Sequence, residues 1–559
     1  MSVNGSSSVT LHDVLAGEVW LGSGQSNMEF RVDQTRDSRQ TIAQAGDPKI
    51  RLFLQRPIMS AKPLDFPEGE WKVCSPKSVG NFSAVAYFFG SNLRKALKVP
   101  VGLIASSWGG SYAESWTPEK VLKSDPAFKP LWSRWNKLPA AERNGWQKGR
   151  FPVDLALRNL RLIPRAPSQA PLTIRAAGVS SPAASGNGPG IWSWSVKDGS
   201  NLAVTILSNA PRMTGSFLSD AWGFMTTSLG SGKPLDLSTY TSVEFEAKGD
   251  GKYILFLSQP TITDWDNYRT PESFPVTKRW KRIRIPFSSL KQSGWGKPQP
   301  FTPNAVLNLS FGVDPKPLID IPSALYNGMI HPLVPFPIRG VLWYQGEANA
   351  IRAPDYGKLL TAMIGGWRKA WELPEMPFLL AQLPNFIPGT GQGKDQWAEL
   401  RDQQRKVAAE PHNQMAVLID LGEHHDIHPK AKAPVGFRLA QAALSEVYGD
   451  KKTSLSPQFG RMDLDGTKLR VHFKDAEEGL ATVGGEIKGL EIAGPDGRFT
   501  KALAKIEKDD LTVWSPSVTD PRSVRYDWGD DPDGNIFGKN GLPAGPFMEK
   551  LPSSKTASN

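Results

Sequence analysis

The sequence predicts an α/β domain that is discontinuous in the chain and interrupted by an antiparallel β-sandwich. Residues 11–164 and 321–450 both alternate apolar, strand-like runs with amphipathic helices. Residues 165–320 instead carry short strand patterns between turns rich in Ser, Gly, Pro and Thr. Residues 451–559 are again β-rich, so we expect a third, smaller β-domain at the end of the chain.

The first segment begins with a short apolar run at 19–21. It ends in Gly22-Ser23-Gly24, which is typical of a strand entering a tight turn. Apolar residues at helical spacing predict an amphipathic helix over 83–97. Pro100 ends that helix, and a buried strand over 101–105 follows.

The inserted segment shows a different periodicity. Its predicted strands cover 203–207, 242–247, 253–257, 282–286 and 306–311. Short strands at this spacing, separated by turn residues, are typical of an antiparallel sandwich.

The second α/β segment resumes the alternation. Its predicted strands cover 340–343, 378–383 and 415–420. Its predicted helices include one around 360–371, one over 397–409 and one that starts near Pro434 and reaches about 447.

Composition excludes several classes of protein. The chain has 559 residues, 39% of them hydrophobic and 22% charged, as in ordinary globular proteins. The net charge of +11 comes from scattered residues, so we expect no nucleic-acid partner. No apolar run is long enough for a membrane helix, and the single cysteine, Cys74, excludes an internal disulfide.

The serine of Gly24-Gln25-Ser26 directly follows a predicted strand and a glycine turn. Side chains at the carboxyl edge of an open α/β sheet face the ligand site. A lone serine there is more often an ordinary helix N-cap, so the assignment of a nucleophile depends on finding a base.

Three of the seven histidines lie within 424–428, after the predicted strand 415–420. A hydroxyl nucleophile needs an imidazole to take its proton and a carboxylate to orient that imidazole, and His428 and Asp426 supply both. The rival is a metal site formed by His424, His425, Asp426 and His428. Neighbouring side chains on an extended segment diverge, whereas zinc ligands usually come from separate elements, so we expect no metal and no cofactor.

Ester hydrolysis also needs hydrogen-bond donors for the oxyanion. Gly109 and Gly110 follow the strand that starts at 101, and their backbone amides can approach a substrate closely. Gln345 and Asn349 follow the strand 340–343 and offer side-chain amides. A plain strand-to-helix turn is the alternative at each place.

Several blocks of this sequence resemble the sialate O-acetylesterase branch of the SGNH hydrolases. They are GEVWLGSGQSNM, VGLIASSWGGSYAESW, YNGMIHPLVPFPIRGVLWYQGEANA, DIHPKAKAPVGFRLA and the ending VRYDWGDDPDGNIFGKNGLPAGPF. The resemblance implies a three-layer α/β/α fold and metal-independent ester hydrolysis. It also implies that Ser26 is the nucleophile, His428 the base and Asp426 its orienter, with Gly109 or Gly110 and Gln345 or Asn349 in the oxyanion hole. The general SGNH pattern often has Asp three residues before His, where this chain has His425.

The insertion resembles jelly-roll carbohydrate-binding modules through its segments 235–247 and 280–287. Its predicted loops carry Trp265 and Trp295 beside polar residues, a combination that suits the faces and hydroxyl rim of a sugar. Packing of these rings in the sandwich core is the alternative. We expect the two tryptophans to bind substrate.

The predicted function is removal of acetyl groups from a glycan, either a fragment of a plant polysaccharide such as xylan or xyloglucan, or a sialate. The alternatives are a non-catalytic glycan-binding protein, or a lipase or thioesterase of the same superfamily. We expect the rate to rise with pH near about 6.5, with Asp426 raising the pKa of His428. The resemblance implies a periplasmic or secreted protein. The first residues lack the features of a signal peptide, so a cytoplasmic protein, or one whose leader has been removed, is equally expected from the residues. No membrane partner is expected, and no feature specifies an oligomeric state.

Overall fold

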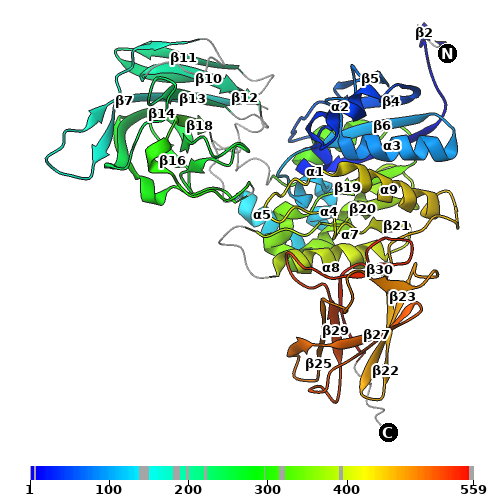
Figure 1. Ribbon diagram of the computed structural model, residues 1–559. Coiled ribbons are helices and arrows are strands. Elements are labelled where there is room, and N and C mark those ends of the chain that lie inside the picture. The colour runs from blue at the N-terminus through cyan, green and yellow to red at the C-terminus, as the bar shows by residue number, and fades with distance from the viewer. Residues whose placement is uncertain are drawn as a thin grey trace.

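The computed structural model describes residues 2–4, 8–136, 150–180, 189–196, 201–218, 223–294, 296–313, 321–388 and 395–552. Within these residues the chain forms a mixed α/β domain, a β-rich domain between two of its strands, and a C-terminal β-domain (Figure 1).

The α/β domain is built on a sheet of seven strands in the order β21-β20-β19-β3-β6-β4-β5. Its neighbours pair in parallel, except that β5 is antiparallel to β4. The strands are β3 (Glu18–Gly24), β4 (Asp47–Gln55), β5 (Gly69–Cys74), β6 (Val101–Ser107), β19 (Gly340–Tyr344), β20 (Phe378–Ala381) and β21 (Asn413–Ala416). Since β3 and β6 come from the first segment and β19 to β21 from the second, the two segments complete one sheet.

Helices cover both faces of this sheet. Trp343 of β19 is paired with Ser23 of β3, so these two side chains point to the same face of the sheet. Trp20 lies three residues before Ser23 on β3 and therefore points to the opposite face, because side chains alternate along a strand. The Trp20 ring lies 5.0 Å from that of Phe89, and the Trp343 ring lies 5.8 Å from that of Trp367. One face is therefore covered by α3 (Ala84–Leu97) with its neighbour α9 (Lys432–Glu446), and the other by α7 (Ala353–Ala370) with its neighbour α8 (Gln396–Ala408) (Figure 1).

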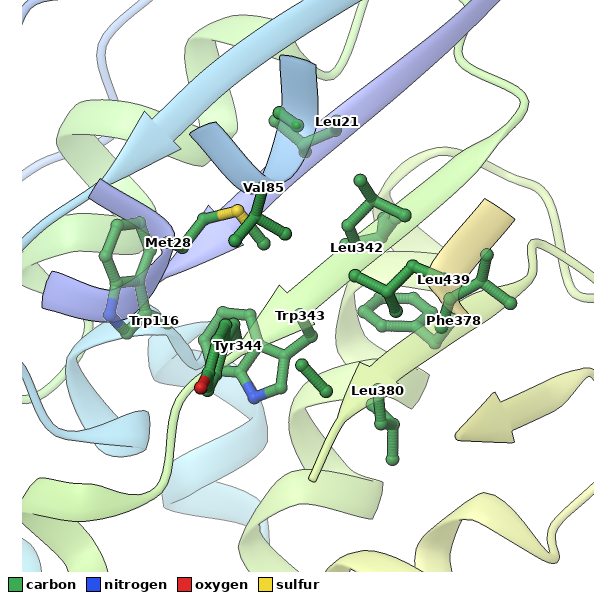
Figure 2. Close-up of a cluster of buried hydrophobic side chains, with 14 of the residues drawn as sticks. Leu21, Met28, Val85, Trp116, Leu342, Trp343, Tyr344, Phe378, Leu380 and Leu439 are labelled. Carbon is green, nitrogen blue, oxygen red and sulfur yellow. The ribbon is translucent and has the colours of Figure 1, made fainter. Parts of the chain in front are cut away.

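Side chains from the helices and from the sheet form an apolar core, part of which is shown in Figure 2. Leu21 and Leu342 come from neighbouring strands, and Val85 and Leu439 come from α3 and α9. All four are fully buried. The helix predicted over 83–97 begins after Ser83, whose hydroxyl accepts the Ala86 amide as an N-cap. The predicted strand 415–420 is shorter, because β21 ends at Ala416 and the chain then enters the loop that carries the histidines.

The β-rich domain consists of two sheets that pack through one core. The long strand β14 (Tyr240–Ser258) belongs to both: it pairs with β7 and β17 in its first half and with β18 in its second. A strand that passes from one sheet to the other in this way makes a corner of the domain. The other strands are β7 (Arg150–Pro164), β8 (Leu172–Thr173), β9 (Gly178–Val179), β10 (Ile191–Val196), β11 (Asn201–Leu207), β12 (Ala210–Leu218), β13 (Gly223–Ser228), β15 (Tyr268–Arg269), β16 (Phe274–Val276), β17 (Lys281–Pro286) and β18 (Asn308–Val313).

The predicted boundary at 165 needs correction. Residues 150–164 were assigned to the first α/β segment, but they form strand β7, which pairs with β12 and β14 of the β-rich domain. Val153, Leu155 and Leu157 alternate along it and are buried in that domain's core. The β-rich domain therefore includes β7 from Arg150 onward, because β7 buries its apolar face against these sheets.

The C-terminal domain contains two four-stranded antiparallel sheets and one two-stranded sheet around a separate core. Its strands are β22 (Gln458–Asp465), β23 (Lys468–Lys474), β24 (Leu480–Thr482), β25 (Leu490–Ala493), β26 (Phe499–Lys501), β27 (Leu503–Glu507), β28 (Asp510–Trp514), β29 (Ser523–Tyr526), β30 (Ile536–Gly538) and β31 (Phe547–Lys550). None of the helices in the described part of the chain has both the length and the apolar composition to cross a membrane.

Candidate active site

A glycine turn positions Ser26 at the carboxyl edge of β3. Gly24 has φ +138°, and a Cβ on it would lie 2.1 Å from the carbonyl oxygen of Tyr344, so no larger residue fits there. The Gln25 amide donates to that same oxygen at 2.9 Å. Helix α1 (Ser26–Glu29) starts at once. Ser26 therefore lies at a helix N-terminus, where backbone amides have no acceptor within the helix.

His428 reaches Ser26 from the loop between β21 and α9. Its Nε2 atom lies 2.8 Å from the Ser26 hydroxyl oxygen, although the two residues are 402 positions apart. A hydroxyl and an imidazole at this distance are arranged for proton transfer from the serine to the histidine.

Asp426 stabilises the same loop from within. Its carboxylate accepts the backbone amide of His428 at 2.9 Å. This bond fixes the backbone of the histidine, and a role for Asp426 on the imidazole ring itself stays a prediction. Burial raises the pKa of Asp426, and the hydrogen bond from the His428 amide opposes that rise.

The pKa of His428 corrects the expected pH dependence. Burial of the imidazole lowers this pKa to about 4, and the positive charge of Lys432 lowers it in the same direction. The sequence led us to expect a rise caused by Asp426. The structure gives the opposite direction for the pKa of His428, because both burial and the charge of Lys432 disfavour the imidazolium.

Gly109, one of the expected oxyanion-hole residues, lies close to Ser26. A Cβ on Gly109 would lie 3.5 Å from the Cβ of Ser26, so this glycine lies directly beside the nucleophile. Its amide donates to the carboxylate of Glu29 at 2.7 Å. A substrate oxygen that uses this amide must therefore displace Glu29. Gly110 follows with φ +72°, a conformation that glycine adopts without strain.

The side chains of Gln345 and Asn349 lie in the interior. The amide nitrogen of Gln345 donates to Ser111 O at 3.1 Å and to Asn349 Oδ1 at 2.7 Å, which uses both of its hydrogens. Asn349 Nδ2 donates to Glu114 at 3.2 Å. We therefore withdraw Gln345 as an oxyanion donor in this conformation, because its buried partners already hold its amide.

A buried polar network around Asn27, the residue after Ser26, was not predicted. Asn27, next to the nucleophile, donates through Nδ2 to Glu347 at 2.6 Å and to the carbonyl of Ile427 at 2.9 Å. Lys432 donates to Asn27 Oδ1 at 2.5 Å. Asn27 thus connects the helix of Ser26 to the loop of His428. Its place in GQSN beside the serine was the only sequence signal for this role.

The charges of this network are held inside the protein. The Lys432 ammonium lies 4.9 Å from the centroid of the Phe30 ring and 5.5 Å from that of Tyr344, which face it as aromatic partners. Burial lowers the pKa of Lys432 to about 7, and the negative charge of Glu347 opposes that shift. Burial raises the pKa of Glu347, and the bond from Asn27 opposes it.

The histidines near residue 425 do not converge. His428 faces Ser26, whereas the Nδ1 atom of His424 lies 2.6 Å from the carboxylate of Asp531. Among the residues that the structure describes, no group of three or more His, Cys, Asp or Glu side chains is placed to hold a metal ion.

One loop of the β-rich domain presents an exposed aromatic ring. Trp265 is 76% exposed and has φ +69°. Its neighbour Asp266 is buried and accepts the amides of Ser293, Gly294 and Gly296 at 2.8 to 3.2 Å, which fixes the loop. Trp295 lies outside the described residues. The positive charge of Lys297, from the same loop region, acts on Asp426, so this region lies near the catalytic loop.

Residues 322–445 match the family model described as carbohydrate esterase, sialic acid-specific acetylesterase. This segment is therefore similar to that family. This match confirms the resemblance identified in the sequence. Residues 199–317 match a second family model, described as complex I intermediate-associated protein 30.

Individual relatives point to the same family. Mouse sialate O-acetylesterase is 39% identical and the human protein 36% identical, each over 123 residues that make up 20% of this chain. The matched part spans only about a quarter of the length of these relatives, 23% and 24%. A solved carbohydrate acetylesterase from Xanthomonas citri is 27% identical with a TM-score of 0.58, covering 96% of this chain and 81% of that one. These relatives support a carboxylic ester hydrolase.

Proposed function

We propose that this protein is a carbohydrate O-acetylesterase that works through an acetyl-enzyme on Ser26. The observation that carries the proposal is the 2.8 Å separation between the Ser26 hydroxyl and His428 Nε2 at the carboxyl edge of the sheet. The similarity to enzymes named as sialate and carbohydrate acetylesterases supports acetyl as the group removed.

In the first half of the reaction, Ser26 Oγ attacks the acetyl carbonyl carbon while His428 Nε2 takes the hydroxyl proton. The carbonyl oxygen becomes an oxyanion, and in this proposal the amides of Ser26 and Gly109 stabilise it once Glu29 has moved away from the Gly109 amide. His428 then gives its proton to the sugar oxygen, the C–O bond breaks, and the deacetylated sugar leaves.

In the second half, a water molecule attacks the acetyl group on Ser26. His428 takes a proton from this water, and the new oxyanion uses the same two amides. Collapse of the intermediate returns the proton to Ser26 Oγ and releases acetate. At neutral pH the imidazole is already in the neutral form that this mechanism requires, because its pKa is about 4.

The glycan itself is proposed to contact the β-rich domain. The fixed loop that carries Trp265 supports a flat apolar surface for a sugar face, and the charge of Lys297 acts on the catalytic loop from the same region. A larger acetylated glycan, such as a plant polysaccharide fragment, fits this arrangement better than an isolated sugar.

The test is acetate release from a panel of acetylated glycans by the wild-type protein and by Ser26→Ala. The variant should lose at least about a thousandfold in rate and remain folded, because it lacks the hydroxyl on which the proposed acyl intermediate forms. Retained activity in Ser26→Ala would show that Ser26 is not the nucleophile. A preference for long acyl chains over acetyl would favour a lipase or thioesterase instead.

A further inference from the structure

The C-terminal domain reaches the catalytic loop through one carboxylate. Asp531 lies between β29 and β30, in the DWGDDPDGN stretch of the chain's ending, to which the proposed mechanism assigns no role. One of its oxygens, Oδ2, lies 2.6 Å from His424 Nδ1, and the other, Oδ1, accepts Asn385 Nδ2 at 2.8 Å. His424 is four residues before His428 on the same loop.

The contacts of Asp531 close into a ring around the start of the catalytic loop. Asn385 accepts the Gly422 amide at 2.9 Å, and the Ile387 amide donates to the His424 carbonyl at 2.8 Å. Asp531 therefore connects two segments of the α/β domain, the one after β20 and the one after β21. Both lie at the edge of the sheet where Ser26 is located.

The segment around Asp531 is itself firmly anchored. The Asp530 carboxylate accepts the Trp397 amide at 2.8 Å at the start of α8, and its carbonyl accepts the Phe386 amide at 3.1 Å. Arg401, fully buried, donates to the carbonyls of Asp530 and Gly529. Because these bonds fix the segment, the position of Asp531 does not depend on His424.

We propose that Asp531 is a positioning residue, which acts through His424 to keep the loop of His428 in register with Ser26. This inference rests on the proposed esterase function. It assigns the C-terminal domain a part in catalysis, because the domain supplies the carboxylate that contacts His424. Displacing a reacting group by about 1 Å can cost about a hundredfold in rate. Loss of a single bond that holds the loop can therefore slow turnover strongly.

The test compares Asp531→Asn with Asp533→Asn in the full-length protein. Asp533 lies in the same stretch, is 80% exposed, and pairs with Lys488 of its own domain. Asp531→Asn keeps the size of the side chain but cannot accept from both His424 and Asn385. We expect its kcat on an acetyl ester to fall about tenfold to a hundredfold with KM little changed, and Asp533→Asn to stay within about twofold of wild type.

A second variant separates positioning from loss of folding. His424 is 69% exposed, so His424→Ala should fold normally, and we expect it to reproduce the loss in kcat. The double variant should lose no more than Asp531→Asn alone, since both changes break one contact. Wild-type kcat in His424→Ala, or in Asp531→Asn, would overturn the proposal. Failure of the esterase function is distinguishable, because then the wild-type protein itself releases no acetate.

Discussion

The pH dependence of turnover offers a quantitative test of the active-site environment. With the pKa of His428 at about 4, about 90% of the imidazole is neutral at pH 5 and nearly all at pH 7. The ratio of kcat/KM between pH 7 and pH 5 should then be about 1.1. An imidazole with an unperturbed pKa of about 6.5 would make the same ratio about 25, so the two cases are far apart.

The pKa of His428 falls because the protein disfavours the charged form of its imidazole. Burial disfavours the imidazolium, and the ammonium of Lys432 repels it, so both make the proton easier to lose. The lowering from 6.5 to about 4 corresponds to about 3 kcal/mol against the protonated histidine. Activity should therefore be flat above about pH 5 and fall only as the pH drops through about 4.

The assay is acetate release from a small acetyl ester between pH 3.5 and 8, stopped at fixed times, with circular dichroism at each pH to show that the protein is folded. Lys432→Met should move the acid midpoint upward, because it removes the repelling charge, whereas Lys432→Arg should keep it low. A wild-type midpoint near 6.5 with the protein folded would refute the argument from burial.

Two further predictions concern substrate and product. Trp265→Ala should weaken turnover of an acetylated oligosaccharide and leave a small acetyl ester unaffected, because the ring is exposed on a fixed loop and has no part in the proposed chemistry; equal loss on both substrates would show a structural role instead. Glu29→Ala should strengthen inhibition by acetate several-fold, because the Gly109 amide that Glu29 occupies becomes open to the carboxylate of the product. Glu29→Gln, which keeps an acceptor, should change this inhibition less, and an unchanged inhibition constant in Glu29→Ala would contradict this role of Glu29.

Local patterns in the sequence were enough to predict most of the elements that carry the site. The strand and glycine turn before Ser26 are visible in consecutive residues, and so is the helical spacing of α3. Residues 150–164, which form β7, were assigned to the wrong domain even though Val153, Leu155 and Leu157 alternate along the strand. Periodicity shows that a segment is a strand, but its partner depends on which sheet can bury its apolar face.

Hydrogen-bond partners were harder to predict than positions. Gln345 was expected to donate to the oxyanion because it follows the strand 340–343 and offers a side-chain amide. Both hydrogens of that amide instead bond to Ser111 and Asn349. Asn27 and Glu347 are 320 residues apart in the chain and 2.6 Å apart in the fold. Nothing in the spacing of such residues indicates that they meet, since their contact follows from the parallel pairing of β3 with β19.

Burial explains why the sign of one electrostatic effect was predicted wrongly. Asp426, His428 and Lys432 lie within seven residues of one another, and the sequence shows two opposite charges on either side of the histidine. Near the surface the carboxylate would dominate through its proximity, and the pKa of the histidine would rise. In the structure the Asp426 carboxylate accepts a hydrogen bond from the backbone amide of His428. Lys432 donates to the buried side chain of Asn27, and the imidazole of His428 is largely buried. The pKa therefore falls, because the cost of desolvating a charge grows with depth and a second buried cation adds to it.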